Sequence, residues 1–169
     1  MTVQEHDESI TIKGVVVTPA HPQRGSESEE FRRNVERLKV DGHYRCFLCG
    51  GSDDLETHHY GCEWSLAELC DFDELKAFLL QNDIYGYSRL LVNLSISSVD
   101  DIRNLMVLCQ GHHTGVDHTD GGTGTGIHNT PHPLWIIQRT AKRGLDPVPQ
   151  EGQTIADVET AIAKAGNSP

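Results

Sequence analysis

Two pairs of metal-binding side chains constrain this chain more than any other feature. Cys46 and Cys49 enclose two residues in "CFLC", and Cys109 and His112 enclose two residues in "CQGH", about sixty residues later. Cys thiolates and His nitrogens in two such pairs form the tetrahedral ligand set that structural zinc takes in proteins. The sequence therefore predicts a closed structural Zn²⁺ site that joins two distant segments of the chain.

The other cysteines do not point to disulfides. The chain has five cysteines, an odd number, and a reducing cytosol would keep its C-x-x-C as thiols. A redox role for Cys46 and Cys49 would need a thioredoxin-like βαβ context, which the sequence lacks. Cys62 and Cys70 lie in or next to apolar stretches without a second pair. There a free Cys behaves as a small hydrophobic side chain.

The length of 169 residues fits one domain with terminal additions. We expect an N-terminal strand and helix that pack on the core in residues 1–42, a zinc-containing domain with a helical insertion in 43–143, and a linker with a C-terminal helix in 144–169. No apolar run reaches the roughly 18 residues of a membrane span, and the N-terminus lacks the features of a signal peptide. The expected location is therefore the cytoplasm.

Hydrophobic periodicity and capping residues predict a mixed α+β fold. The expected strands cover residues 10–18, 55–60 and 105–109, and the expected helices cover 26–42, 65–83, 97–105, 132–144 and 154–166, with a further helix starting at 110.

The histidines near the zinc pairs follow a recognisable order. His58 and His59 stand together on the first expected strand after the C-x-x-C, and Asn104 stands at the start of the next strand. The second zinc pair ends that strand, and His113 follows directly. Over roughly residues 43–118 this order resembles the HNH endonuclease family. The resemblance implies a ββα-metal core with a zinc knuckle and with added helices at both ends and between the strands.

The resemblance also implies an activity and roles for the residues that match. The activity is metal-dependent hydrolysis of DNA phosphodiester bonds. His59 inherits the role of general base, which suits histidine because its ordinary pKa of about 6.5 favours proton abstraction near neutral pH. His58 and His113 inherit the role of ligands of the catalytic divalent cation, which would be Mg²⁺, Mn²⁺, Ni²⁺ or Zn²⁺. Asn104 is expected either to orient the base or to pin the hairpin.

The sequence departs from the family at the next position. Many members carry another His four residues after the last one, on the same helix face. Here position 117 is Asp, and His118 follows one residue later. Asp117 keeps the helical step, whereas His118 keeps the usual ligand type. We favour His118 as the third ligand of the catalytic cation, with Asp117 as the alternative.

The charge distribution limits what can be expected of DNA binding. Residues 41–143 hold 14 acidic and 7 basic residues, and the formal net charge of the chain is −11. Affinity for DNA depends strongly on Lys and Arg that displace counterions. We therefore expect DNA to be a substrate that is bound weakly in isolation, with a protein partner to assist. One modest basic cluster that could meet a phosphate backbone comprises Arg139, Lys142 and Arg143.

Two functions follow from these patterns. The first is an HNH endonuclease of the sort found as small free-standing genes in bacteria and phages, acting in a bacterial host cell. The alternative is a catalytically silent HNH-fold zinc domain that serves assembly or protein interaction. Only the first would nick plasmid DNA when a divalent metal is supplied.

Overall fold

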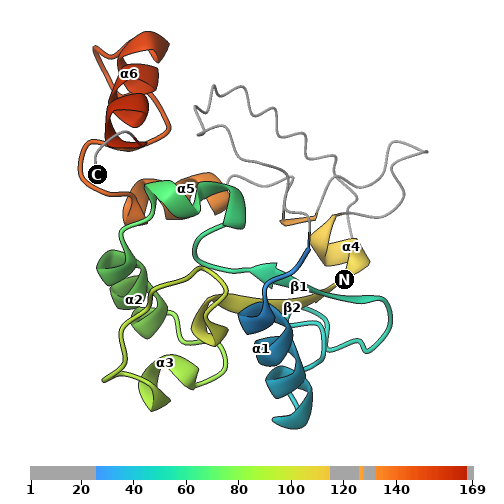
Figure 1. Cartoon of the computed structure of the whole chain (residues 1–169). Helices are drawn as coiled ribbons and strands as arrows, with labels where there is room; N and C mark the ends of the chain where they lie inside the picture. The colour runs from blue at the N-terminus through green and yellow to red at the C-terminus, as the bar shows by residue number, and fades with distance from the viewer. Residues whose placement is uncertain (1–25, 115–125, 128–131, 167–169) are drawn as a thin grey trace, which may run out of the picture.

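An antiparallel pair of strands lies at the centre of the structure, with helices around it (Figure 1). The structure is a computed structural model that describes residues 26–114, 126–127 and 132–166. Its elements in chain order are α1 (Glu29–Val40), β1 (Leu55–His59), the 3-10 helix η1 (Trp64–Leu69), α2 (Phe72–Gln81), α3 (Tyr87–Leu90), the 3-10 helix η2 (Ile102–Asn104), β2 (Leu105–Cys109), α4 (Gln110–His113), α5 (His132–Thr140) and α6 (Ile155–Gly166). The described part of the chain is thus α+β, as predicted.

The register of the two strands decides which residues meet. Leu55 at the start of β1 lies opposite Cys109 at the end of β2, and His59 lies opposite Leu105. Residues 105–108 of β2 are all buried, which explains why this strand is a continuous apolar run rather than an alternating one. The pairing brings the second half of the predicted zinc set beside the segment that precedes β1.

Helix α1 covers one face of this hairpin. Ser28 caps the helix by accepting a hydrogen bond from the backbone N–H of Phe31, and two glutamates occupy the first turn, where the helix dipole favours negative charge. Phe31 and Leu38 are buried in one cluster with Leu105 of β2. The apolar spacing that predicted the helix is therefore the spacing that packs it onto the hairpin.

The residues between the two strands form a helical insertion that shares a hydrophobic core with α5 and α6. Leu75 of α2 is buried in the same cluster as Ile137 of α5 and Val158 of α6. A bridge between Cys70 and Ala141 joins the insertion to the end of α5. In Figure 1, α2, α3 and α5 accordingly gather at one side of the hairpin, while α4 follows β2 at its other end.

Two of the expected helices differ from prediction. The helix expected over 65–83 is interrupted at Asp71, because the carboxylate of this residue accepts hydrogen bonds from the N–H groups of Asp73 and Glu74 and starts a new helix, α2. The prediction of a helix over 97–105 was also wrong, because only the short 3-10 helix η2 forms there. Helix α3 was not expected, and the strand expected over 10–18 lies outside the described residues.

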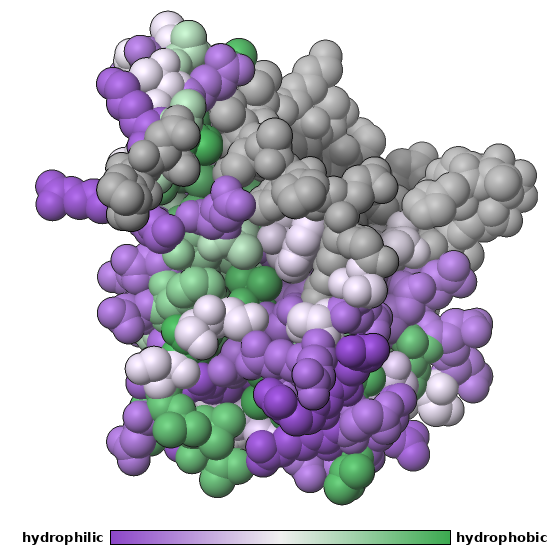
Figure 2. All heavy atoms as spheres, viewed as in Figure 1, coloured by the Kyte–Doolittle hydropathy of each residue, from purple (hydrophilic) through white to green (hydrophobic). Residues whose placement is uncertain are grey.

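One of the apolar areas on the surface lies over α3 (Figure 2). Figure 2 shows a hydrophilic outer face on α1 and hydrophobic side chains over α3. The latter area includes Leu90 and Leu94, which are 67% and 57% exposed. Within the described residues, every helix is too short or too polar to traverse a lipid bilayer.

Candidate metal centre and histidine site

The four residues predicted to bind zinc come together. One ligand atom from each of Cys46, Cys49, Cys109 and His112 lies within 4.8 Å of all the others. The Nδ1 atom of His112 is 3.1 Å from the Sγ of Cys109 and 3.5 Å from that of Cys46. The Sγ atoms of Cys49 and Cys109 are 3.9 Å apart. A tetrahedral zinc ion with bonds of about 2.0 to 2.3 Å has edges of about 3.3 to 3.8 Å, so the cluster can hold a metal ion and is consistent with structural zinc.

The first pair lies on a tight turn that depends on two glycines. The N–H of Gly50 donates to the carbonyl of Cys46, and the N–H of Cys46 donates to the carbonyl of Gly51, both at 2.8 Å. Gly50 has a φ of +73°, which favours glycine. A Cβ on Gly51 would lie 3.3 Å from the Sγ of Cys49. The two glycines of "CGG" therefore allow the turn that directs the Sγ atoms of Cys46 and Cys49 toward the predicted zinc position.

Hydrogen bonds prepare one of these sulfurs for a cation. Burial of Cys46 opposes ionisation, but hydrogen bonds from the backbone N–H groups of Cys109, Cys49 and Leu48 outweigh it and lower the pKa of Cys46 to about 6. The thiolate is the form that binds metals. The turn and the end of β2 together thus favour the protonation state that zinc requires.

His58 and His113 meet on one face of the hairpin. Their ring centroids are 5.1 Å apart and their planes are inclined at 65°. Two imidazoles on one tetrahedral ion would have centroids about 5 Å apart, given metal–nitrogen bonds of about 2.1 Å. Glu56 and His58 share this face because they are two residues apart on β1. The carboxylate of Glu56 contacts Nδ1 of His113.

A second carboxylate lies beside His58. The Oε1 atom of Glu63 is 3.4 Å from the Nε2 atom of His58. This separation exceeds the roughly 2.7 to 3.2 Å of an N–H···O hydrogen bond. Glu63 is largely buried, and burial raises its pKa to about 7. An acid with this pKa is readily converted to a carboxylate when a cation arrives.

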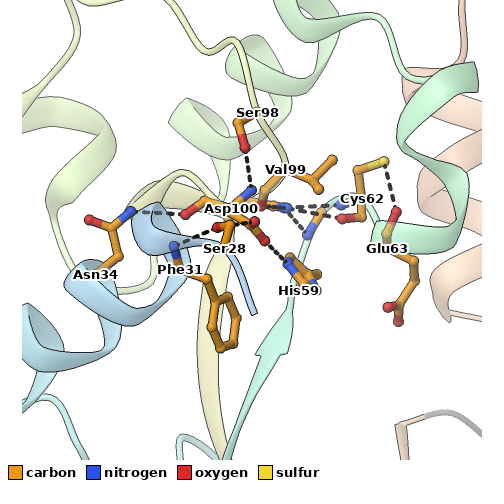
Figure 3. Close-up of polar contacts among 11 residues, drawn as sticks. Ser28, Phe31, Asn34, His59, Cys62, Glu63, Ser98, Val99 and Asp100 are labelled. Atoms are coloured by element: carbon orange, nitrogen blue, oxygen red, sulfur yellow. Dashed lines mark hydrogen bonds and ion pairs between the residues drawn. The ribbon is translucent and has the colours of Figure 1, made fainter. Parts of the chain in front are cut away.

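His59 points to the other face of the hairpin, toward α1. Its ring centroid is 5.5 Å from that of Phe31. Its Nε2 atom is 2.8 Å from the Oδ1 atom of Asp100. The second oxygen of this carboxylate accepts a hydrogen bond of 2.6 Å from the hydroxyl of Ser28. Figure 3 shows Asp100 between the start of α1 and the end of β1.

Asn104 is fully buried, and its side-chain amide forms four hydrogen bonds to backbone groups. Its Oδ1 atom accepts hydrogen bonds from the N–H groups of Gly61 and Cys62, at 2.7 and 3.0 Å. Its Nδ2 group donates to the carbonyls of Cys62 and Val99, at 2.9 and 2.7 Å. These bonds use the whole capacity of the amide. Of the two expected roles, this geometry fits pinning the hairpin.

Other residues named from the sequence are placed elsewhere. Asp117 and His118 lie outside the described residues. In the basic cluster, Arg139 forms an ion pair of 2.5 Å with Glu74, and the Nζ of Lys142 donates to a backbone carbonyl in η1 at 3.0 Å. Both cations are therefore engaged within the protein.

Two acidic residues near the histidines were not identified from the sequence. Glu56 had a local signal, since a residue two positions before His58 on a strand shares its face. Asp100 had none, because its contact with His59 spans 41 residues. In the sequence, "SSVDD" instead has the pattern of a helix start.

Comparison of the chain with protein-family models, with curated proteins and with solved structures finds no match in any of the three.

Proposed function

We propose that the chain is a metal-dependent endonuclease of the HNH kind, which hydrolyses phosphodiester bonds in DNA. In this proposal β1, β2 and α4 form a ββα-metal core. The observation that supports it best is the meeting of His58 and His113, with ring centroids 5.1 Å apart, on the strand and helix that adjoin the zinc ligands. Two imidazoles beside carboxylates are a donor set for a divalent cation.

The donors on this face fit the cation that the activity needs. His58 and His113 would hold it, and Glu56 fixes the ring of His113 through Nδ1 as carboxylates commonly do for metal-binding histidines. Glu63 adds negative charge next to His58. When bound, the cation neutralises charge on the scissile phosphate.

His59 would act on the water nucleophile. It occupies the last position of β1, next to His58, and its side chain is about 10% exposed. In hydrolysis, a proton passes from water to His59 while the water oxygen bonds to phosphorus. The bond from phosphorus to the leaving oxygen breaks, and this oxygen takes a proton from solvent. Asn104 supports the step indirectly by holding the backbone that follows β1.

The acidic surface sets the expected binding behaviour. With 14 acidic and 7 basic residues in 41–143, few cations are available to displace counterions from DNA. Bound zinc and the catalytic cation would supply part of the missing positive field. Nicking by the isolated protein should therefore be weak and should fall with added salt.

Plasmid nicking with and without Mg²⁺ or Mn²⁺ tests the proposal. His59→Ala should lower the rate by roughly 10²- to 10⁴-fold and retain the zinc content, since a general base contributes to rate. His113→Ala should raise the cation concentration needed for half-maximal nicking. His43→Ala, which changes a histidine that stacks on Tyr85, is the matched control. Equal nicking by the parent, His59→Ala and His113→Ala would refute the proposal and indicate a contaminating nuclease.

One observation favours a second function, that of a zinc domain for protein interaction. Leu90, Val92 and Leu94 are exposed in and after α3, where Figure 2 shows an apolar area. Exposed apolar areas of this kind often mark protein interfaces. A protein that fails to nick DNA with any divalent cation, yet loses self-association or partner binding in Leu90→Ser, would have this second function.

A further inference from the structure

Asp100 is held rigidly between α1 and the predicted base. Its side chain is buried, and each carboxylate oxygen has a defined neighbour: Oδ1 contacts Nε2 of His59 at 2.8 Å, and Oδ2 accepts from the hydroxyl of Ser28 at 2.6 Å (Figure 3). Its backbone is held as well. The carbonyl accepts from the amide of Asn34 at 2.8 Å, and the N–H donates to the hydroxyl of Ser98 at 3.0 Å.

This contact determines which nitrogen of His59 carries hydrogen. A carboxylate only accepts hydrogen bonds, so Nε2 of His59 must donate to Asp100. The donor hydroxyl of Ser28 on the other oxygen supports the ionised form of Asp100. A neutral imidazole with hydrogen on Nε2 has its lone pair on Nδ1.

We infer that Asp100 is the positioning residue of the nuclease site. It holds His59 as the Nε2–H tautomer, so that Nδ1 is the nitrogen that takes the proton from water, and it stabilises the imidazolium that forms. The catalytic part of this inference rests on the proposed function. The tautomer of His59 does not.

The inference assigns to Asp100 a role that the sequence pattern offered to Asn104. The amide of Asn104 is committed to backbone groups of Gly61, Cys62 and Val99. Asp100, four residues earlier, makes the contact with His59 that Asn104 does not. A negatively charged partner also stabilises an imidazolium more strongly than a neutral amide does.

A merely structural role for Asp100 predicts something different. Because the residue also binds Ser28 and Asn34, it holds the start of α1 in place. If that were its only function, any change that loosens α1 to the same extent would reduce nicking equally. Ser28→Ala provides this comparison, since it removes both the α1 cap and the contact with Oδ2 while leaving Oδ1 beside His59.

The test combines a spectroscopic and a kinetic measurement on the full chain. The protein is labelled with ¹⁵N-histidine, and the His59 signals are assigned by their loss in His59→Gln. In the neutral form of the ring, Nε2 should carry the hydrogen and Nδ1 should not. In Asp100→Asn the two tautomers should mix or invert, because the new amide can donate to Nε2.

The kinetic measurement separates positioning from folding. Asp100→Asn should lower kcat for plasmid nicking by about 10²- to 10⁴-fold, with little change in KM for DNA or in the Mn²⁺ concentration for half-maximal activity. Ser28→Ala should lower the melting temperature at least as much, but kcat by less than about tenfold. Equal loss of kcat in both variants would overturn the inference.

The measured tautomer of His59 tests the role of Asp100 even if the protein shows no nuclease activity. A wild-type spectrum with hydrogen on Nδ1 of His59 would overturn it whatever the activity. If the parent nicks no DNA with any divalent cation, the proposed function has failed, and the wild-type spectrum still shows whether His59 is the Nε2–H tautomer that its contact with Asp100 requires. The tautomer is read from the wild type, with His59→Gln used only for the assignment, so the result remains decisive even if Asp100→Asn does not fold.

Discussion

Replacement of Asn104 by Ala should lower the free energy of unfolding by about 4 kcal/mol. The substitution removes four buried hydrogen bonds and leaves two backbone N–H groups and two backbone carbonyls without their partner. A typical hydrogen bond contributes about 1 kcal/mol net, and an unsatisfied buried group costs about 1 to 3 kcal/mol. Since domains of this size have unfolding free energies of about 5 to 15 kcal/mol, the loss is a large part of the total.

Urea denaturation followed by circular dichroism measures this loss. Asn34→Ala is the matched control, because Asn34 is also buried but its amide makes one recorded hydrogen bond, to the carbonyl of Asp100. It should cost about 1 kcal/mol. The zinc content must be the same in the parent and both variants, so that the differences in stability come from the loss of the amides. If Asn104→Ala lowers the free energy of unfolding no more than Asn34→Ala does, the four hydrogen bonds of Asn104 do not stabilise the fold as proposed.

The remaining predictions concern the metal centre, a buried acid and a close contact. The purified protein should contain about one zinc per chain by elemental analysis, and Cys46→Ser should lose that zinc and melt at a lower temperature, because the ligand set is closed. Burial raises the pKa of Glu63 from 4.5 to about 7, so the folded state resists ionisation. Without added cation, stability should therefore be full below about pH 4.5 and fall as the pH rises toward 7. Glu63→Gln should remove this fall and gain at most about 3 kcal/mol at pH 8 in urea denaturation, whereas a flat profile in the parent would contradict the account. Gly61→Ala should lower thermal stability by about 1 to 3 kcal/mol, because the new Cβ would lie 2.8 Å from the Cδ1 of Leu75; an unchanged melting temperature would count against this contact.

The parts of the fold that the sequence predicted depend on local patterns. Cys46, Cys49, Cys109 and His112 could be grouped because metal geometry requires two closely spaced pairs, whatever the chain does between them. β2 could be recognised because four apolar residues lead directly to a predicted ligand, Cys109. Helix α1 could be predicted because its capping residue, its N-terminal acidic residues and its apolar spacing all lie within one short segment.

The parts that were missed depend on contacts between distant segments. Asp100 looks like a helix-capping residue in "SSVDD", yet it binds His59 and Ser28, which are 41 and 72 residues away. The break before α2 did have a local signal, because Asp71 followed three residues later by Glu74 is a capping pattern. Periodic apolar residues on both sides of Asp71 concealed it. The roles given to His58, His59 and His113 stay predictions.

The junction at the end of the hairpin has an evolutionary consequence. The N–H of Tyr60 donates to the carbonyl of Asn104 at 2.6 Å, so the insertion leaves and rejoins the hairpin at one point. Closing a longer loop between fixed ends costs only about 0.6 kcal/mol for each doubling of its length. Residues can thus be gained, lost or exchanged within the insertion without moving the histidines of β1, as long as Glu63, Asp100 and the contacts of Asn104 are kept. Homologous chains should accordingly vary most in length between these two residues, and a foreign segment grafted there should leave the metal centre intact.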